Sequence, residues 1–311
     1  MLLLTDDRFE EHETGQHPEH AGRLRAIRAE LSESGVLSRC QMGTPRSATN
    51  AELERIHPAN HIRHVEHIAS SGGGRLDADT VCSPRSADIA RLAAGTACAA
   101  VDAVLANKTR HAMALLRPPG HHALADQAMG FCLYNNIAIA AQHARFQHGL
   151  DRILIIDWDV HHGNGTEAIF YDKENVTFFS IHRYPFYPGT GAAADTGTGA
   201  GLGHNFNVPV KYGTSRQDYF ARFNAALEAA ADLARPQLIL LSAGFDAHRL
   251  DPIGSLDLES EDYIQLTRSL IDAANTHCQG RIVSLLEGGY NVDALAESVR
   301  LHLETLLAAG C

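Results

Sequence analysis

The chain has 311 residues, of which 45% are hydrophobic and 20% are charged, a composition typical of globular proteins. Its formal net charge of -11 argues against nucleic-acid binding through a diffuse basic surface and is compatible with a cationic substrate. No apolar run approaches membrane-spanning length, and the first residues, MLLLTDDRFEEHE, are too acidic for a signal peptide. The length favours one large α/β domain over residues 1–311.

The six cysteines are scattered along the chain, and none forms a CxxC pair. This spacing predicts neither a disulfide framework nor a thiolate zinc site. Reduced, mostly buried thiols in a cytoplasmic protein are therefore expected. Most of the 19 histidines fall on predicted helices or loops, and those such as His61, His64 and His67 are expected to be solvated.

Predicted strands and helices alternate along the chain. Short apolar runs predict strands at residues 1–5, 112–116, 153–156, 176–182, 238–242 and 282–286. Periodic apolar positions predict helices at residues 24–31, 51–56, 62–68, 84–106, 134–144, 166–170, 215–234, 259–277 and 293–307, with Asp293 capping the last. Residues 183–205 are expected to form a loop at the rim. The alternation predicts a mostly parallel sheet with helices on both faces.

The predicted sheet is centred on residues 153–165, which read ILIIDWDVHHGNG. The apolar run is typical of a buried parallel strand, and it ends in Asp157, Asp159 and His161. In extended chain these three side chains would share one face. Buried carboxylates beside an imidazole would repel or stay unsatisfied without a cation, so a metal site is predicted. A loop of hydrogen-bonded polar side chains is the alternative.

Other polar residues also follow predicted strands. His121 and His122, Asp246 and Tyr290 lie just beyond strand ends, the edge where open α/β sheets bind ligands. Asp159, His161 and Asp246 would form a three-ligand site with an open position, typical of catalytic zinc. Because two carboxylates neutralise Zn²⁺, a separate general base is needed, which the two histidines can supply.

Taken together, these stretches resemble the histone deacetylase family. The matching motifs are RPPGHHA (117–123), GFCLYNN (130–136), DWDVHHGNGT (157–166), YPGTG (187–191), SAGFDAH (242–248) and LEGGYN (286–291). HPE (17–19) and LDADTVCSP (76–84) match more weakly. The resemblance covers nearly the whole chain in order. RPPGHHA and HHGNG resemble the class II and bacterial deacetylase-like branch, which includes acetylpolyamine amidohydrolases.

The resemblance implies an arginase-like α/β fold. Three αβα layers would surround a mostly parallel sheet of about eight strands, with the active site at the strands' C-terminal ends. It implies zinc-dependent hydrolysis of N-acetyl-lysine amides to lysine and acetate, without a covalent enzyme intermediate. Zinc would be bound by Asp159, His161 and Asp246. One potassium ion is implied near Asp157, Ser180 and Ile181, and a second, less strongly, near the carbonyls of Phe170, Lys173 and Val176.

The resemblance also assigns catalytic roles. His122 is expected to take a proton from the attacking water, and His121 to be its charged neighbour, held by Asp157. Tyr290 is expected to hydrogen-bond the substrate carbonyl oxygen and then the oxyanion. Asn164 stands where some members have Asp, as class II members do, so His122 should be less basic here than beside a carboxylate.

The remaining implied residues contact substrate. Phe131 and Tyr187 would wall an acyl-lysine tunnel, the Gly130 carbonyl would accept the substrate amide N–H, and Gly288 would allow the backbone to pass close to the substrate.

Substrate choice depends on the tunnel mouth. Polyamine-specific members use an acidic gatekeeper, and one known arrangement places Glu after the Asp-Pro that here is followed by Ile253. That favours an acetylated lysine in a protein or peptide over an acetylpolyamine, although Asp77 and Asp79 could supply the missing charge. An inactive acyl-lysine-binding homologue is a further alternative, and RPPGHHA and Tyr290 argue against a dimanganese arginase site. The oligomeric state stays open.

Overall fold

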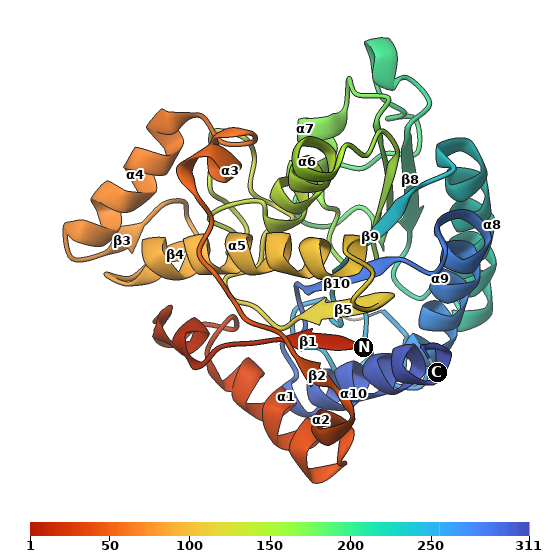
Figure 1. Ribbon diagram of the computed structural model, residues 1–311, viewed down its shortest axis with the longest axis horizontal. Coiled ribbons are helices and arrows are strands. Elements are labelled where there is room, and N and C mark those ends of the chain that lie inside the picture. The colour runs from red at the N-terminus through yellow and green to blue at the C-terminus, as the bar shows by residue number, and fades with distance from the viewer. Residues whose placement is uncertain (255, 311) are drawn as a thin grey trace.

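Eight parallel strands form one sheet in a computed structural model that describes residues 1–254 and 256–310 (Figure 1). Their order across the sheet is β2-β1-β5-β10-β9-β6-β7-β8, and every pairing is parallel. Their bounds are β1 (Leu2–Leu4), β2 (Gln41–Met42), β5 (His111–Ala114), β6 (Ile153–Asp157), β7 (Val176–Arg183), β8 (Asn205–Val210), β9 (Leu238–Ala243) and β10 (Ile282–Leu286). A separate antiparallel pair joins β3 (Gly74–Arg75) and β4 (Val81–Cys82).

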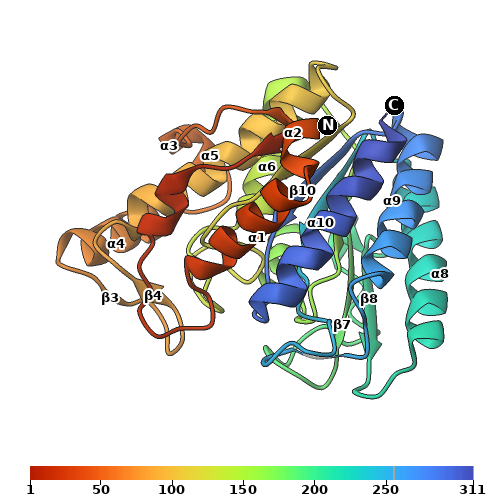
Figure 2. The same cartoon turned by 90° about the horizontal axis from the view of Figure 1, so that it is seen from below.

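Helices cover both faces of this sheet (Figures 1 and 2). α5 and α6 pack together on one face, and α1, α10, α9 and α8 lie in sequence across the other. The helices are α1 (Gly22–Glu33), α2 (Val36–Arg39), α3 (Asn50–Glu54), α4 (Ala59–Ser70), α5 (Ser86–Leu105), α6 (Asn136–His148), α7 (Asn164–Phe170), α8 (Arg216–Ala234), α9 (Asp262–Cys278) and α10 (Val292–Ala309), with 3-10 turns at Asp7–Glu11 and Gly199–Gly201. The predicted three-layer αβα architecture is confirmed.

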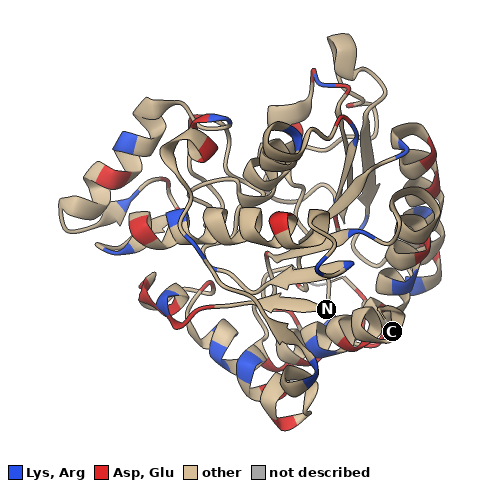
Figure 3. Cartoon of the chain, viewed as in Figure 1, with Lys and Arg blue, Asp and Glu red and all other residues tan. Residues whose placement is uncertain are grey.

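The apolar strands lie in the interior. Every residue of β5, β6, β9 and β10 is buried, and most charged residues belong to the outer helices and loops (Figure 3). No helix among the described residues is both long and apolar enough to cross a bilayer. The continuous apolar runs of the sequence therefore mark central parallel strands covered on both faces.

All six predicted strands are present, but two edge strands were not predicted. β2 has only two residues, both exposed, so it lacks an apolar signal. β8 reads NFNVPV, and its buried positions are occupied partly by asparagine rather than by a continuous apolar run. Its proline is tolerated because β8 is at the edge of the sheet.

Two local predictions were wrong. The cap of α10 is Asn291, whose side chain accepts from the Ala294 N–H at 3.1 Å, whereas Asp293 lies inside the first turn. His61 is buried, with Nε2 3.0 Å from the Leu133 carbonyl, although His64 and His67 are exposed as expected. The five described cysteines are free thiols, as predicted, and Cys311 lies outside the described residues.

A buried histidine makes stability depend on pH. His302 is 0% exposed and lies between Thr267 and Ser284, with Nδ1 2.7 Å and Nε2 3.1 Å from their hydroxyls. Burial lowers the pKa of His302 to about 3. The unfolded chain binds this proton below about pH 6.5, so stability falls as the pH drops from there toward 3.

We expect the lowered pKa of His302 to make the unfolding free energy about 2 kcal/mol smaller at pH 5 than at pH 7. Urea unfolding at both pH values measures this loss. His302→Gln should show a smaller loss than the wild type, whereas His64→Gln, at an exposed position, should leave it unchanged. Equal losses in all three proteins would contradict the assignment.

Candidate active site

The site lies at the carboxyl edge of the sheet. Asp157, the last residue of β6, is in register with Ser180 on β7 and Ser242 on β9. Because all strands run parallel, the loops that follow β5, β6, β9 and β10 leave the sheet at this same edge. The predicted convergence of residues far apart in sequence follows directly from this topology.

Asp159, His161 and Asp246 form a buried group at this edge. Their donor atoms lie within 4.8 Å of one another, and the two carboxylates are 0% exposed. His161 Nδ1 lies 3.0 Å from Asp159 Oδ1 and 3.1 Å from Asp246 Oδ2. Burial, and then the Asp159 carboxylate, raise the pKa of Asp246 to about 7. Two buried carboxylates therefore need positive charge between them, and this N/O donor set suits zinc.

Asp157, Asp159 and His161 were predicted to share one face of an extended strand, but a different geometry brings Asp159 and His161 together. The chain leaves the extended conformation at Asp157 instead of continuing as a strand. The Asp159 N–H donates to Asp157 Oδ1 at 3.1 Å, and the His161 N–H donates to Asp159 Oδ1 at 2.9 Å. Two successive side-chain-to-backbone turns, rather than alternation along a strand, direct these side chains to one place.

Two glycines leave room for the ligand carboxylates. A Cβ at Gly288 would lie 2.2 Å from Asp246 Oδ2, and a Cβ at Gly244 would lie 2.2 Å from Asp159 Oδ2. The Gly288 N–H also donates to Asp159 Oδ2 at 2.9 Å. Gly288 was predicted for its closeness to substrate, whereas its observed contacts are with the metal-ligand group. Gly244 was not predicted.

His121 and His122 lie side by side, with ring centroids 3.9 Å apart, but have different partners. His121 Nδ1 lies 2.9 Å from Asp157 Oδ2, as predicted. Burial alone would lower the pKa of His121, but the carboxylates of Asp157 and Asp159 raise it to about 10. His121 is therefore the charged member of the pair.

His122 Nδ1 lies 2.7 Å from Asn164 Oδ1, so the predicted Asn164 contact is present. Burial and the neighbouring His121 and His161 hold the pKa of His122 well below its usual value. The amide oxygen accepts the Nδ1–H without adding a negative charge, which leaves Nε2 as an unprotonated acceptor. His122 thus has the state that a general base requires.

A cavity of about 240 Å³ leads to this group. Phe131, Tyr187, Ile253 and Gly130, which are expected to contact substrate, line it together with His122, His161 and Tyr290. The Phe131 and Tyr290 rings meet edge to face with centroids 5.9 Å apart. The cavity is small and partly aromatic, which suits an apolar stem carrying a small polar end group.

Three further residues of the site, Phe186, Asp251 and Glu287, were not predicted, and the role of a fourth, Asp79, was left open. Phe186 stacks on His161 with a 5.2 Å centroid separation and lines the cavity, although only its neighbour Tyr187 was predicted. The Asp251 carboxylate accepts from the Ile253 N–H at 2.9 Å and the Tyr290 N–H at 2.7 Å. Asp79 also lines the cavity.

Glu287 contacts the loop that carries His121 and His122. Its Oε2 accepts from the Gly120 N–H at 2.7 Å and the His121 N–H at 3.2 Å, which positions the loop that carries the histidine pair. Glu287 belongs to the LEGGYN motif, but the motif alone did not indicate a role for it.

The potassium residues are also close to one another. Asp157 and Ser180 are paired across β6 and β7, and Ile181 follows on β7. The Ser180 hydroxyl lies 2.9 Å from His182 Nδ1. A potassium ion at this position stays a prediction.

Residues 17–306 match the histone deacetylase domain. The chain is 42% identical over 276 residues to a histone deacetylase-like amidohydrolase of Pseudomonas aeruginosa, covering 88% of this chain and 73% of that protein. It is 40% identical over 302 residues to the human polyamine deacetylase HDAC10, covering 93% of this chain and 44% of that protein. The crystal structure of the HDA15 HD domain superposes with a TM-score of 0.92 at 37% identity, covering 99% of this chain and 89% of that one, which confirms the arginase-like fold. The chain belongs to the histone deacetylase family.

Proposed function

We propose that the chain is a zinc-dependent deacetylase that hydrolyses N-acetyl-lysine amides in proteins or peptides to lysine and acetate. One observation carries this proposal: His161 of the metal-ligand group, the neutral His122 and Tyr290 all line the same cavity. A ligand, a base and a hydroxyl donor therefore reach one substrate position, as amide hydrolysis requires.

Each residue then has a defined task. Bound zinc would polarise the substrate carbonyl and acidify the attacking water. His122 Nε2 accepts a proton from that water, while the Asn164 amide holds the ring in place. The Tyr290 hydroxyl donates to the carbonyl oxygen as negative charge develops on it. The protonated His121 stands beside His122 and can supply positive charge and a proton to the departing amine.

Asp157 links this chemistry to the predicted potassium site. Its Oδ2 is engaged by His121, and its strand neighbour Ser180 provides a hydroxyl oxygen on β7. We propose that potassium binds at Asp157, Ser180 and Ile181. A hard cation there would be bound by oxygen ligands and would offset the charge of the Asp157 carboxylate.

Acetate release from an acetyl-lysine peptide tests the proposed function. Activity should disappear after treatment with a chelator, return when Zn²⁺ is added, and be inhibited by a hydroxamate. Asp246→Asn should be inactive at the same zinc concentration because it weakens the ligand group. Peptide binding without acetate release by the wild type would instead support an acyl-lysine-binding protein, and full activity without metal would exclude the zinc mechanism.

The cavity mouth favours acetyl-lysine over acetylpolyamines. Ile253 lines the cavity and offers no charge for the second ammonium group of a polyamine, whose desolvation then costs free energy. We expect Ile253→Glu to shift kcat/KM toward acetylated putrescine by about tenfold, since a partly exposed ion pair is worth on the order of 1 kcal/mol. Parallel turnover of both substrates measures the ratio, with Ile253→Gln as an uncharged control.

Acetylpolyamine hydrolysis is the second candidate, and Asp79 is the observation that favours it. Asp79 lines the cavity together with Ile253, and one relative is named a polyamine deacetylase. If the wild type prefers acetylputrescine and Asp79→Asn abolishes that preference, Asp79 replaces Ile253 as the residue that determines specificity. A preference for acetyl-lysine in both proteins supports the first proposal.

A further inference from the structure

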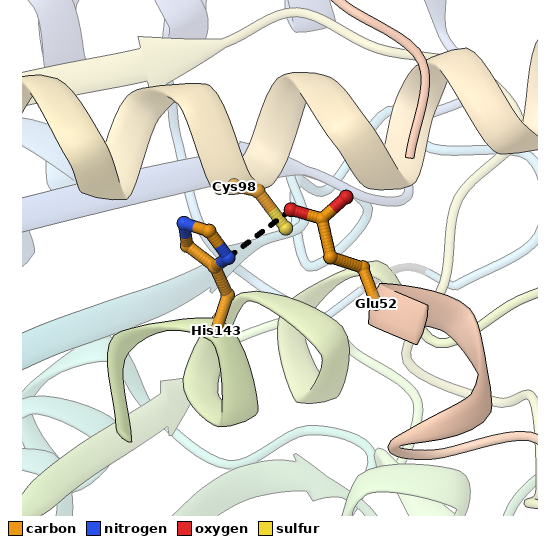
Figure 4. A group of neighbouring side chains, drawn as sticks. All are labelled: Glu52, Cys98 and His143. Atoms are coloured by element: carbon orange, nitrogen blue, oxygen red, sulfur yellow. Dashed lines mark ion pairs between the residues drawn. The ribbon is translucent and has the colours of Figure 1, made fainter. Parts of the chain in front are cut away.

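A second buried group of metal-ligand type lies away from the active site. Glu52 on α3, Cys98 on α5 and His143 on α6 converge, with donor atoms within 4.8 Å of one another (Figure 4). Their exposed fractions are 7%, 0% and 4%. The cysteine spacing predicted no thiolate site, because the three residue types come from three separate helices rather than from one motif.

The orientation of His143 points to a ligand. Its Nε2 lies 2.6 Å from Asp102 Oδ1, and this carboxylate accepts the Nε2–H. Its Nδ1 is buried, makes no hydrogen bond among the described residues, and lies 3.2 Å from Glu52 Oε1, an ion-pair contact (Figure 4). The imidazole thus lies between two carboxylates, an environment in which a cation is favourable.

Glu52 retains an acceptor position for such a cation. Its Oε2 accepts from Arg46 Nη1 at 2.9 Å and from the Thr49 N–H at 2.8 Å. Its Oε1 accepts from Arg46 Nη2 at 2.7 Å. A carboxylate oxygen has two lone pairs, so one remains on Oε1, on the side that faces His143.

We propose that Glu52, Cys98 and His143 provide three ligands of a zinc ion that ties α3, α5 and α6 together. Carboxylate oxygen, thiolate sulfur and imidazole nitrogen are all established zinc ligands. The Asp102–His143 hydrogen bond is the carboxylate partner that metal-bound histidines characteristically have. His148 belongs to the surroundings of the site, because its Nε2 lies at hydrogen-bond distance, 2.7 Å, from the same Asp102 oxygen.

The charges of the site balance. On binding, the Cys98 thiol releases its proton to solvent and a sulfur–zinc bond forms. The Glu52 and Asp102 carboxylates and the Cys98 thiolate then face Zn²⁺ and the Arg46 guanidinium, which lies 3.6 Å from Asp102. Arg46 and Asp102, which lie beside the group, also line a surface cavity of about 340 Å³.

Cobalt titration tests this site without relying on the catalytic one. The metal-free chain is titrated with Co²⁺, and the near-ultraviolet thiolate-to-cobalt charge-transfer band is recorded. The candidate catalytic group contains no cysteine, so its occupation does not contribute to this band. We expect the band in the wild type and in Cys278→Ala, whose buried thiol on α9 is a matched control, and its loss in Cys98→Ala.

A second variant guards against misfolding of Cys98→Ala. His143→Gln keeps the thiol and removes the imidazole, and we expect it to weaken cobalt binding at least tenfold, as read from the same band. The proposal is overturned if the wild type shows no band, or if the band persists in folded Cys98→Ala. In the first case, His143 is a clamp held between the Glu52 and Asp102 carboxylates, and the deacetylase proposal is unaffected.

Discussion

Tyr290→Phe is expected to lower kcat by about 10²–10³-fold, the usual cost of losing one donor to a developing oxyanion. The substitution keeps the ring, which meets Phe131 edge to face and lies 5.1 Å from the Arg23 guanidinium carbon. The Asp251 carboxylate holds the backbone N–H of Tyr290 at 2.7 Å, independently of its hydroxyl. The lost oxygen should therefore change transition-state stabilisation and leave the fold intact.

Tyr187→Phe is the matched control for this loss. Tyr187 lines the same cavity but has no proposed role beyond that of a wall, so kcat should change little. Metal content should equal that of the wild type in both variants, because neither tyrosine belongs to the ligand group. Equal kcat values for Tyr290→Phe and Tyr187→Phe would reduce Tyr290 to a packing residue.

The central part of the fold could be predicted because its signal is local. The apolar runs that became β6, β9 and β10 are buried on both faces, and each is followed by polar residues of the site. β8 and β2 could not be predicted in the same way. An edge strand is stabilised by pairing with the neighbouring strand. The sequences of β2 and β8 contain no signal that identifies this neighbour.

In the candidate site, too, some residues could be predicted from the sequence and others could not. Asp159, His161 and Asp246 could be predicted because each follows a strand, and parallel strands bring their ends together. The roles of Asp251 and Glu287 could not, because each carboxylate acts on backbone N–H groups of a different loop. Such contacts depend on how loops fold over one another, and a single sequence does not specify that.

The Glu52, Cys98 and His143 group is the extreme case. Its members lie on three separate helices, so they meet only when those helices pack against one another. Long-range convergence of this kind is visible only in three dimensions.

His122→Gln is expected to lower kcat by about 10²–10⁴-fold, the usual contribution of a general base. Glutamine fills a similar volume and can still contact Asn164, but it cannot accept and hold a proton at neutral pH. The buried His122 is held neutral, whereas the neighbouring His121 is held charged by Asp157, so His121 cannot take over as base without first losing its own proton.

The control for His122→Gln is a buried histidine outside the cavity. His61 contacts the Leu133 carbonyl, with Nε2 3.0 Å from its oxygen. A glutamine at position 61 can still donate a hydrogen bond to that oxygen. We expect near-normal kcat for His61→Gln and unchanged zinc content in both variants, measured on acetyl-lysine peptide. If His122→Gln keeps most of its activity while His121→Gln loses it, the two roles are reversed: the Asp157-linked histidine is the base, and its negative partner, rather than a neutral amide, sets the proton affinity used in catalysis.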